Sequence, residues 1–388
     1  MIDKASGTVR PVVLSASTLG LVWMGDALLY VVMPLYAASF QIALPWVGVV
    51  LSLNRIVRIF GYGWIDTLTQ RFGGKTMMVA AAFAAALSTL LYGLVQGLIP
   101  LLAARFLWGL AYGVLNVLST VYALDDEKAT GRHVGLSRAI SASGPALALS
   151  GGALIAVYLG PRDVFLVLGV LGFLAVPTAL ALPALRDGPS EKAPQTQSRW
   201  MPSSLNVLFF TLMLAVDGIF PMTLSLLLAQ WLSVGSAILA AGLMLAFLRA
   251  TTVIGSLISG GVIDRVGANR VLGISVVGII IGLLGVAGGY VYVAAIIIII
   301  ARGFLGTAGP VLVAEQTGGT KVGRMAAYST WIDCGLAAGP LVAGALFIPL
   351  GPNGLYSLLA LAVMGALAAY LAVGSSGRNC QPHTTGPS

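Results

Sequence analysis

Twelve apolar stretches limit what this chain can fold into more than any other feature of its sequence. Each is long enough to cross the ~30 Å hydrocarbon core of a bilayer as a helix. Lipid-exposed backbone must satisfy its own hydrogen bonds, and the short alternating segments of a closed barrel do not occur, so helices are predicted. The stretches lie at roughly residues 12–38, 44–65, 76–97, 99–121, 135–159, 163–184, 203–231, 236–262, 270–290, 292–314, 325–349 and 353–373.

The composition agrees with this reading of the apolar stretches. Hydrophobic residues make up 58% of the 388 residues and charged residues 9%, whereas a soluble domain is about 25% charged. The sequence therefore predicts an all-α membrane protein with twelve transmembrane helices.

The basic residues are distributed unevenly between the two sides of the predicted membrane. If the N-terminus is inside, the inner side carries 14 of the 21 Lys and Arg residues, and the outer loops carry only Arg162. This asymmetry follows the positive-inside rule and predicts that both termini are cytoplasmic, in an inner or plasma membrane. The net charge of +8 is explained by this topology, so no nucleic-acid partner is predicted.

The chain divides into two similar halves at a polar stretch, residues 185–202, whose Pro, Ser and Gln content is typical of a flexible linker. Landmarks recur across it in the same order, between 191 and 197 residues apart: Asp26 and Asp217, Arg55 and Arg249, Arg71 and Arg265, Arg105 and Arg302, Gly144 and Gly339. We therefore expect two pseudo-symmetric six-helix bundles, residues 1–184 and 203–374, followed by a short cytoplasmic tail, residues 375–388.

Three short motifs carry a resemblance to a known family. The loop after the eighth span reads Gly260-x-x-x-Asp264-Arg265-x-Gly267, the fourth span contains Arg105-x-x-x-Gly109, and the fifth contains Gly144-Pro145 followed by Gly151-Gly152. Together with twelve spans, these motifs resemble the major facilitator superfamily of transporters, over nearly the whole chain. The resemblance implies the two-bundle fold of that family and transport by alternating access, and the fifth-span motif is similar to the one associated with antiporters.

The loop after the second span departs from the family pattern. Gln70 stands where the family has Asp, and Asp66 stands where it has Gly. In the family this loop latches the two halves together on the cytoplasmic side. The sequence therefore does not decide whether the first half of this chain keeps the latch. The residues assigned to gating or to motifs are Asp66, Gln70, Arg71, Gly73, Arg105, Gly109, Arg138, Gly144, Pro145, Gly260, Asp264, Arg265, Gly267, Arg302, Gly306, Gly339 and Pro340.

Charged residues inside the spans indicate a site, because a charge near the bilayer centre is costly and calls for a reason. Asp26 and Arg55 lie near mid-depth, and Arg58 shares a helix face with Arg55. Packing within the bundles is an equally good explanation for Arg105, and snorkelling to the membrane surface explains Arg138 better. Six arginines face three aspartates within the spans, an excess that an anionic ligand would neutralise.

These charges predict two sets of site residues near the midplane. The substrate-binding set is Arg55, Arg249, Arg58, Tyr30, Tyr112 and Asn116, although core or interface packing explains each of the tyrosines and Asn116 better. The proton-coupling set is Asp26 first, then Asp217 or Asp333. An aspartate whose arginine partner is taken by substrate would accept a proton more readily, and this competition would couple substrate binding to proton uptake.

The predicted function is proton-coupled export of a small polar solute, anionic or zwitterionic, by a monomer in the lipid bilayer. Import of an organic anion and lipid flipping by the same fold remain as alternatives. An enzyme is not expected, because His133 and His383 are the only histidines and no nucleotide-binding motif occurs. No metal and no cofactor are predicted.

Overall fold

The computed structural model describes residues 3–126, 129–149, 158–185, 202–228, 230–232, 234–316 and 319–378. Within these ranges the chain forms helices and turns and no strand, which confirms the predicted all-α fold. Eight helical segments are long and apolar enough to cross a membrane. The predicted linker falls almost wholly on residues 186–201, and most of the predicted tail on 379–388, so both lie outside the described residues.

The helices of the first half follow the predicted spans in order. They are α1 (Asp3–Leu35), the short 3-10 helix η1 (Ala37–Phe40), α2 (Leu44–Phe72), α3 (Gly74–Leu94), α4 (Leu98–Ala123), α5 (Thr130–Leu147), α7 (Asp163–Gly172) and α8 (Ala175–Leu180). Gly73 joins α2 to α3 in one residue, because its φ of 81° is a conformation that glycine adopts without strain. The sixth predicted span is divided into α7 and α8, and residues 150–157 of the fifth, with Gly151 and Gly152, lie outside the described residues.

The second half is built in the same order. It consists of α9 (Ser204–Leu212), the π-helical segment η3 (Met213–Ile219), α10 (Phe220–Leu228), α11 (Val234–Val266), α12 (Ala268–Ala287), α13 (Val291–Glu315) and α14 (Lys321–Arg378). Gly267, with a φ of 94°, joins α11 to α12 as Gly73 joins α2 to α3. A break at Gly351, whose φ is 64°, divides α14 into the eleventh and twelfth predicted spans.

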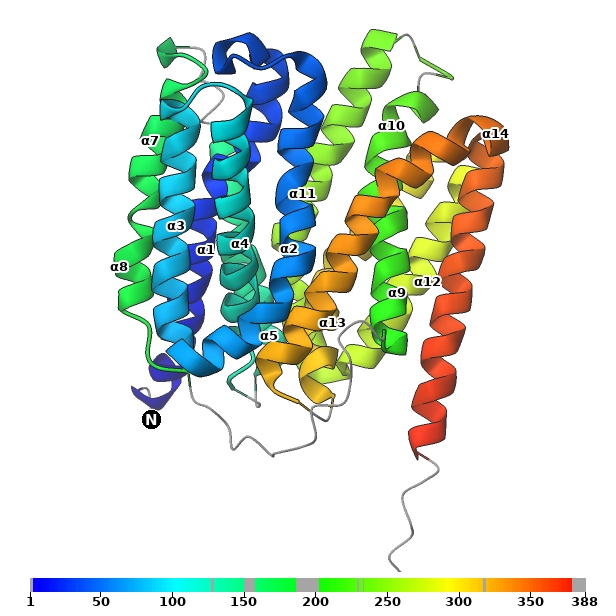
Figure 1. Ribbon diagram of the computed structural model, residues 1–388. Coiled ribbons are helices and arrows are strands. Elements are labelled where there is room, and N and C mark those ends of the chain that lie inside the picture. The colour runs from blue at the N-terminus through cyan, green and yellow to red at the C-terminus, as the bar shows by residue number, and fades with distance from the viewer. Residues whose placement is uncertain are drawn as a thin grey trace, which may run out of the picture.

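Figure 1 shows the first-half helices, blue to green, beside those of the second half, which run from green to red. The N-terminus and the end of α14 lie at the same end of the molecule, which we call the terminal side. The halves meet mainly where α5 packs against α11 and α2 packs against α14. Large apolar side chains such as Phe60, Trp64 and Ile99 are more than half exposed on the outside, as expected of a surface that faces lipid.

The Gly-Pro motifs lie where two helix backbones touch. A Cβ atom at Gly144 in α5 would collide with the carbonyl oxygen of Gly20 in α1. A Cβ atom at Gly339 in α14 would collide with the Cα of Gly218 in η3. Each glycine precedes a proline inside its helix, Pro145 or Pro340. Small residues let transmembrane helices approach this closely, so these positions fix the packing of each half.

Candidate functional site

An ion pair between Asp26 of α1 and Arg105 of α4 lies inside the first half. Arg105 has no exposed surface. Its other hydrogen bonds go to the carbonyl oxygens of Val50 (3.1 Å) and Leu51 (3.2 Å) and to the hydroxyls of Tyr30 (3.3 Å) and Tyr92 (3.4 Å). A guanidinium has five N–H groups, and these five partners satisfy all of them. Asp26 and Tyr30 therefore belong to a closed hydrogen-bond network within one half.

A second ion pair repeats this arrangement in the other half. The Nε of Arg302 in α13 donates to Oδ2 of Asp217 in η3 over 2.5 Å. The landmarks that recur in the sequence thus make the same pairing, with the aspartate on the first helix of each half and the arginine on the fourth. The second-half pair is more open: the Asp217 side chain is 22% exposed, against 7% for Asp26.

A third ion pair crosses between the halves. Arg58 of α2 donates from Nε to Oδ2 of Asp333 in α14 (2.9 Å) and from Nη2 to Oδ1 (2.8 Å). The hydroxyl of Tyr62 donates to the same Oδ2 over 2.9 Å, and the Arg58 guanidinium lies 4.7 Å from the centre of the Tyr112 ring. From the sequence, Arg58 was assigned to the substrate-binding set and Asp333 to the proton-coupling set. The sequence did not predict that the two side chains form a pair.

Arg55 and Arg138 remain without a carboxylate partner among the described residues. The Nη1 of Arg55 donates to the carbonyl oxygen of Leu336, across to the other half, over 3.4 Å. The Nη1 of Arg138 donates to the amide oxygen of Asn116 over 3.5 Å. Both arginines are half-buried, so part of the predicted excess of positive charge resides at these two side chains. The side chain of Arg249 lies outside the described part of the chain.

Two aspartates hold the halves together on the terminal side. Asp264, near the end of α11, accepts hydrogen bonds from the backbone N–H groups of Gly131 (2.8 Å) and Arg132 (3.0 Å) in the first turn of α5. A Cβ at Gly260 would lie 2.5 Å from the carbonyl oxygen of Gly131, so α11 and α5 also touch there. In the other half, Asp66 of α2 accepts from the hydroxyl of Thr320, over 2.6 Å, just before α14 begins.

The Asp66 contact bears on the question of the first-half latch. Gln70, where the family has its aspartate, is exposed and makes no hydrogen bond that the structure shows. Asp66 lies four residues earlier on the same helix face and reaches the start of α14 instead. A signal for this was present, because Gly131-Arg132 and Gly323-Arg324 recur 192 residues apart at the two helix starts.

The remaining motif residues are placed as follows. Arg71 and Arg265 are exposed in the last turns of α2 and α11. Gly109 fits closely against α2, since its Cβ would lie 2.9 Å from the carbonyl oxygen of Asn54. Its predicted counterpart, Gly306, faces only the Arg302 side chain. Gly303, which the sequence did not single out, makes the close approach instead, 2.8 Å from the carbonyl oxygen of Thr251.

Comparison with protein families settles the relationship that these motifs and pairings suggest. A family model described as the Major Facilitator Superfamily matches residues 16–249, more than half of the chain. The chain belongs to the major facilitator superfamily. No curated protein sequence matches it significantly.

Solved structures of this superfamily share the fold. The crystal structure of the human organic anion transporter MFSD10 (TETRAN) matches with a TM-score of 0.73 and 15% identity, over 94% of this chain and 99% of that one. The proton:xylose symporter XylE, bound to 6-bromo-6-deoxy-D-glucose, matches with a TM-score of 0.72 and 13% identity, over 95% and 96% of the two chains. At these identities the likeness shows the fold, and the predicted membrane transporter fold is confirmed.

Proposed function

We propose that this superfamily member is a secondary active transporter for a small organic anion, which binds between the halves at Arg55 and Arg138. The observation that carries the proposal is that both arginines are half-buried and have only neutral hydrogen-bond partners among the residues that the structure describes. A guanidinium keeps its proton, so a carboxylate or phosphate is the ligand that neutralises it. Arg249, the counterpart of Arg55 in the other half, remains part of the proposed site.

We further propose that Asp333 couples transport to protons. Asp333 is 4% exposed, and its carboxylate holds Arg58 of the other half. Protonation would remove the negative charge of this pair and weaken the link that must open when the halves change their relative orientation. Asp26, which the sequence put first, is instead surrounded by groups of its own half, so its protonation would disturb the packing of α1 against α4. Asp217, in the more open pair, is the second candidate.

Export is the proposed direction, on the resemblance of Gly144-Pro145 to the antiporter motif. The closeness of α5 to α1 at Gly144 supports the view that this motif controls how two helices slide past each other. MFSD10 is an organic anion transporter, as its description states. That description agrees with an anionic substrate, but the proposal depends on the two arginines of this chain.

Thermal unfolding of the purified protein tests the proposed substrate class. Mono- and dicarboxylates, phosphorylated metabolites, zwitterions and neutral sugars would be added separately, and stabilising compounds would then be tested for pH-gradient-driven movement in proteoliposomes. We expect anions to raise the Tm and to move against their gradient when a pH gradient is imposed. Stabilisation by neutral sugars alone would overturn the anion proposal, and transport indifferent to the pH gradient would overturn the coupling.

A further inference from the structure

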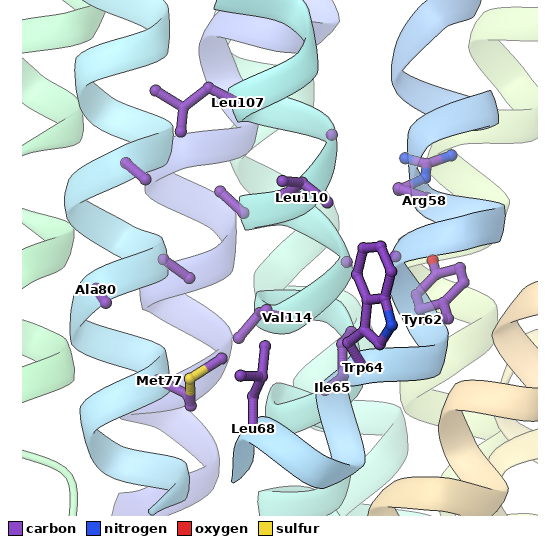
Figure 2. A pocket seen from close by; sticks show the side chains of 16 residues that line it. Arg58, Tyr62, Trp64, Ile65, Leu68, Met77, Ala80, Leu107, Leu110 and Val114 are labelled. Carbon is purple, nitrogen blue, oxygen red and sulfur yellow. The ribbon is translucent and has the colours of Figure 1, made fainter. Parts of the chain in front are cut away.

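A groove of about 250 Å³ runs along the outside of the first half, between α2, α3 and α4 (Figure 2). Its walls are apolar, with contributions from Trp64, Leu68, Met77, Ala80, Leu110 and Val114. It exists because small residues line the space between the larger ones: Gly61, Ala84, Gly109 and Gly113. Trp64 on its edge is 63% exposed, so the groove opens sideways, toward the bilayer, and not into the interface that holds Arg55 and Arg138.

The groove runs lengthwise along these helices. Leu107 and Arg58 lie in its part farther from the terminal side, and Leu68 and Met77 lie toward the terminal side (Figure 2). Ten residues, as from Arg58 to Leu68, rise about 15 Å along a straight helix, and α2 bends before Leu68 (Figure 2), so this part of the groove spans at most about half of a hydrocarbon core. Among the components of a bilayer, an acyl chain is the one that fits a narrow apolar groove of this length.

Positive charge collects where the groove ends. Arg71 is exposed in the last turn of α2, and Lys75 lies in the first turn of α3. Neither has a carboxylate partner in the part of the chain that the structure describes. No side chain caps α3, whose N-cap is Gly73, so backbone N–H groups of its first turn are also available. A helix N-terminus flanked by two cationic side chains favours a phosphate.

We propose that the groove binds an anionic phospholipid of the leaflet on the terminal side. One acyl chain fills the groove, and the headgroup phosphate contacts Arg71, Lys75 and the first turn of α3. A more open hollow lies in the second half on α11 and α12, lined by Val266, Arg270, Gly273, Ile274 and Val277, beside an α12 N-terminus that no side chain caps. Of these residues only Ile274 is the repeat counterpart of a groove residue, Ala80, so the proposal depends on the groove of the first half.

The lipid would act on the transporter without being its cargo. Arg58 and Tyr62 line the groove, and the same two side chains hold Asp333 of the other half. An acyl chain in the groove therefore packs against the residues of the Arg58–Asp333 pair and favours the conformation in which the pair is formed. This inference does not depend on the proposed substrate.

Thermal unfolding of the full-length protein in detergent tests the site. Dioleoylphosphatidylglycerol, dioleoylphosphatidylcholine and glycerol 1-phosphate would be titrated separately. We expect a saturable rise in Tm with the anionic lipid, a smaller rise with the zwitterionic lipid, and none with glycerol 1-phosphate, because the free headgroup lacks the acyl chain. An equal rise in Tm with the two lipids would overturn the proposed preference for an anionic headgroup. The same rise with glycerol 1-phosphate as with the anionic lipid would overturn the proposal that the groove binds an acyl chain.

Three variants separate the parts of the site. Ala80→Phe places a ring in the groove from an exposed position on α3, and should abolish the lipid-dependent rise in Tm. Arg71→Gln combined with Lys75→Gln should remove the preference for the anionic lipid. Ala362→Phe makes the same change at an exposed position of α14 that lines neither hollow, and should keep the full rise.

The proposal is wrong if Ala80→Phe behaves as Ala362→Phe does, or if the double variant keeps the wild-type lipid preference. Ala84→Leu, a smaller change in the same groove, replaces Ala80→Phe if that variant does not purify as a folded protein. Thermal unfolding with the candidate substrates is measured without added lipid, in a separate experiment from the lipid titration. Failure of the anion proposal and failure of the lipid proposal are therefore distinguishable.

Discussion

Arg58 of α2 and Asp333 of α14 are joined by two hydrogen bonds, 2.9 and 2.8 Å long, that connect the first half of the molecule to the second. Both side chains are less than a tenth exposed. Removing one partner of a buried ion pair leaves an uncompensated charge, at a typical cost of about 3–5 kcal/mol. The conformation in which the halves separate at this point must therefore neutralise or rehydrate both groups, which is why we assign the coupling proton to Asp333.

The first prediction concerns this coupling. Asp333→Asn should abolish accumulation driven by a pH gradient and leave exchange down a gradient, because the side chain can no longer gain and lose a proton. Transport in proteoliposomes, with and without the gradient, measures both. Asp163→Asn changes an exposed aspartate at the start of α7 and should behave as wild type. Full gradient-driven accumulation by Asp333→Asn would remove Asp333 from the mechanism.

The second prediction compares the two ion pairs that lie within the halves. Asp26→Asn leaves the fully buried Arg105 without its counter-charge, so we expect destabilisation of about 3–5 kcal/mol. Asp217→Asn should cost clearly less, because Arg302 and Asp217 are both about a fifth exposed and water can solvate them. Unfolding in detergent ranks the two variants. The opposite ranking would show that burial does not control the strength of these pairs.

The third prediction concerns anion binding. Arg55→Ala should raise the Kd of a stabilising anion at least about tenfold, because a charged contact at a partly buried site is lost. Arg55→Lys should also weaken binding, since it keeps the charge but loses the planar fork. Arg138→Gln should weaken binding similarly, whereas Arg10→Gln, at an exposed position of α1, should not. Titration calorimetry measures all four, and unchanged affinity in Arg55→Ala would make this arginine a packing residue.

The fourth prediction tests the two aspartates on the terminal side. A cysteine at Ser256, which is 1% exposed where α11 meets α5, reports on opening there when Cys334 and Cys380 have been replaced. Maleimide labelling of this cysteine should become faster with Asp264→Ala and with Asp66→Ala, since each loses a contact that holds the halves together.

Gln70→Ala is the matched control for the fourth prediction. It lies one turn from Asp66 on α2 and makes no hydrogen bond that the structure shows, so labelling should stay at the wild-type rate. If Asp66→Ala labels no faster than Gln70→Ala, the Asp66 contact does not hold this side closed.

The helices and their order could be predicted from the sequence, because apolar runs of membrane length permit little else. The repeat could be predicted too, and the Asp26–Arg105 and Asp217–Arg302 pairs show that landmarks recurring in the same order make the same aspartate–arginine contact in each half. The limits of this reasoning appear at Arg55 and Arg58. They share a helix face, yet one reaches a carbonyl oxygen and the other a carboxylate of the opposite half.

The contacts that Arg55 and Arg58 make with the other half could not be predicted, since spacing along one helix carries no information about the register of a distant helix. The same limit explains why the charge excess was predicted but not its location at Arg138. That side chain was expected to snorkel to the membrane surface, whereas in the structure it donates to Asn116 of α4. The π-helical segment at Met213–Ile219 also leaves no mark in the apolar pattern.

The position of Asp66 bears on how such a transporter can change over time. Asp66 and Gln70 are four residues apart, so a carboxylate at either place projects from the same face of α2 toward the start of α14. A chain with acids at both places therefore keeps this contact when only the one at position 70 is replaced. What matters for the contact is then a carboxylate on this face of α2 and not an aspartate at one motif position. A comparison of single motif positions would classify this chain as defective at a point where its contact is intact.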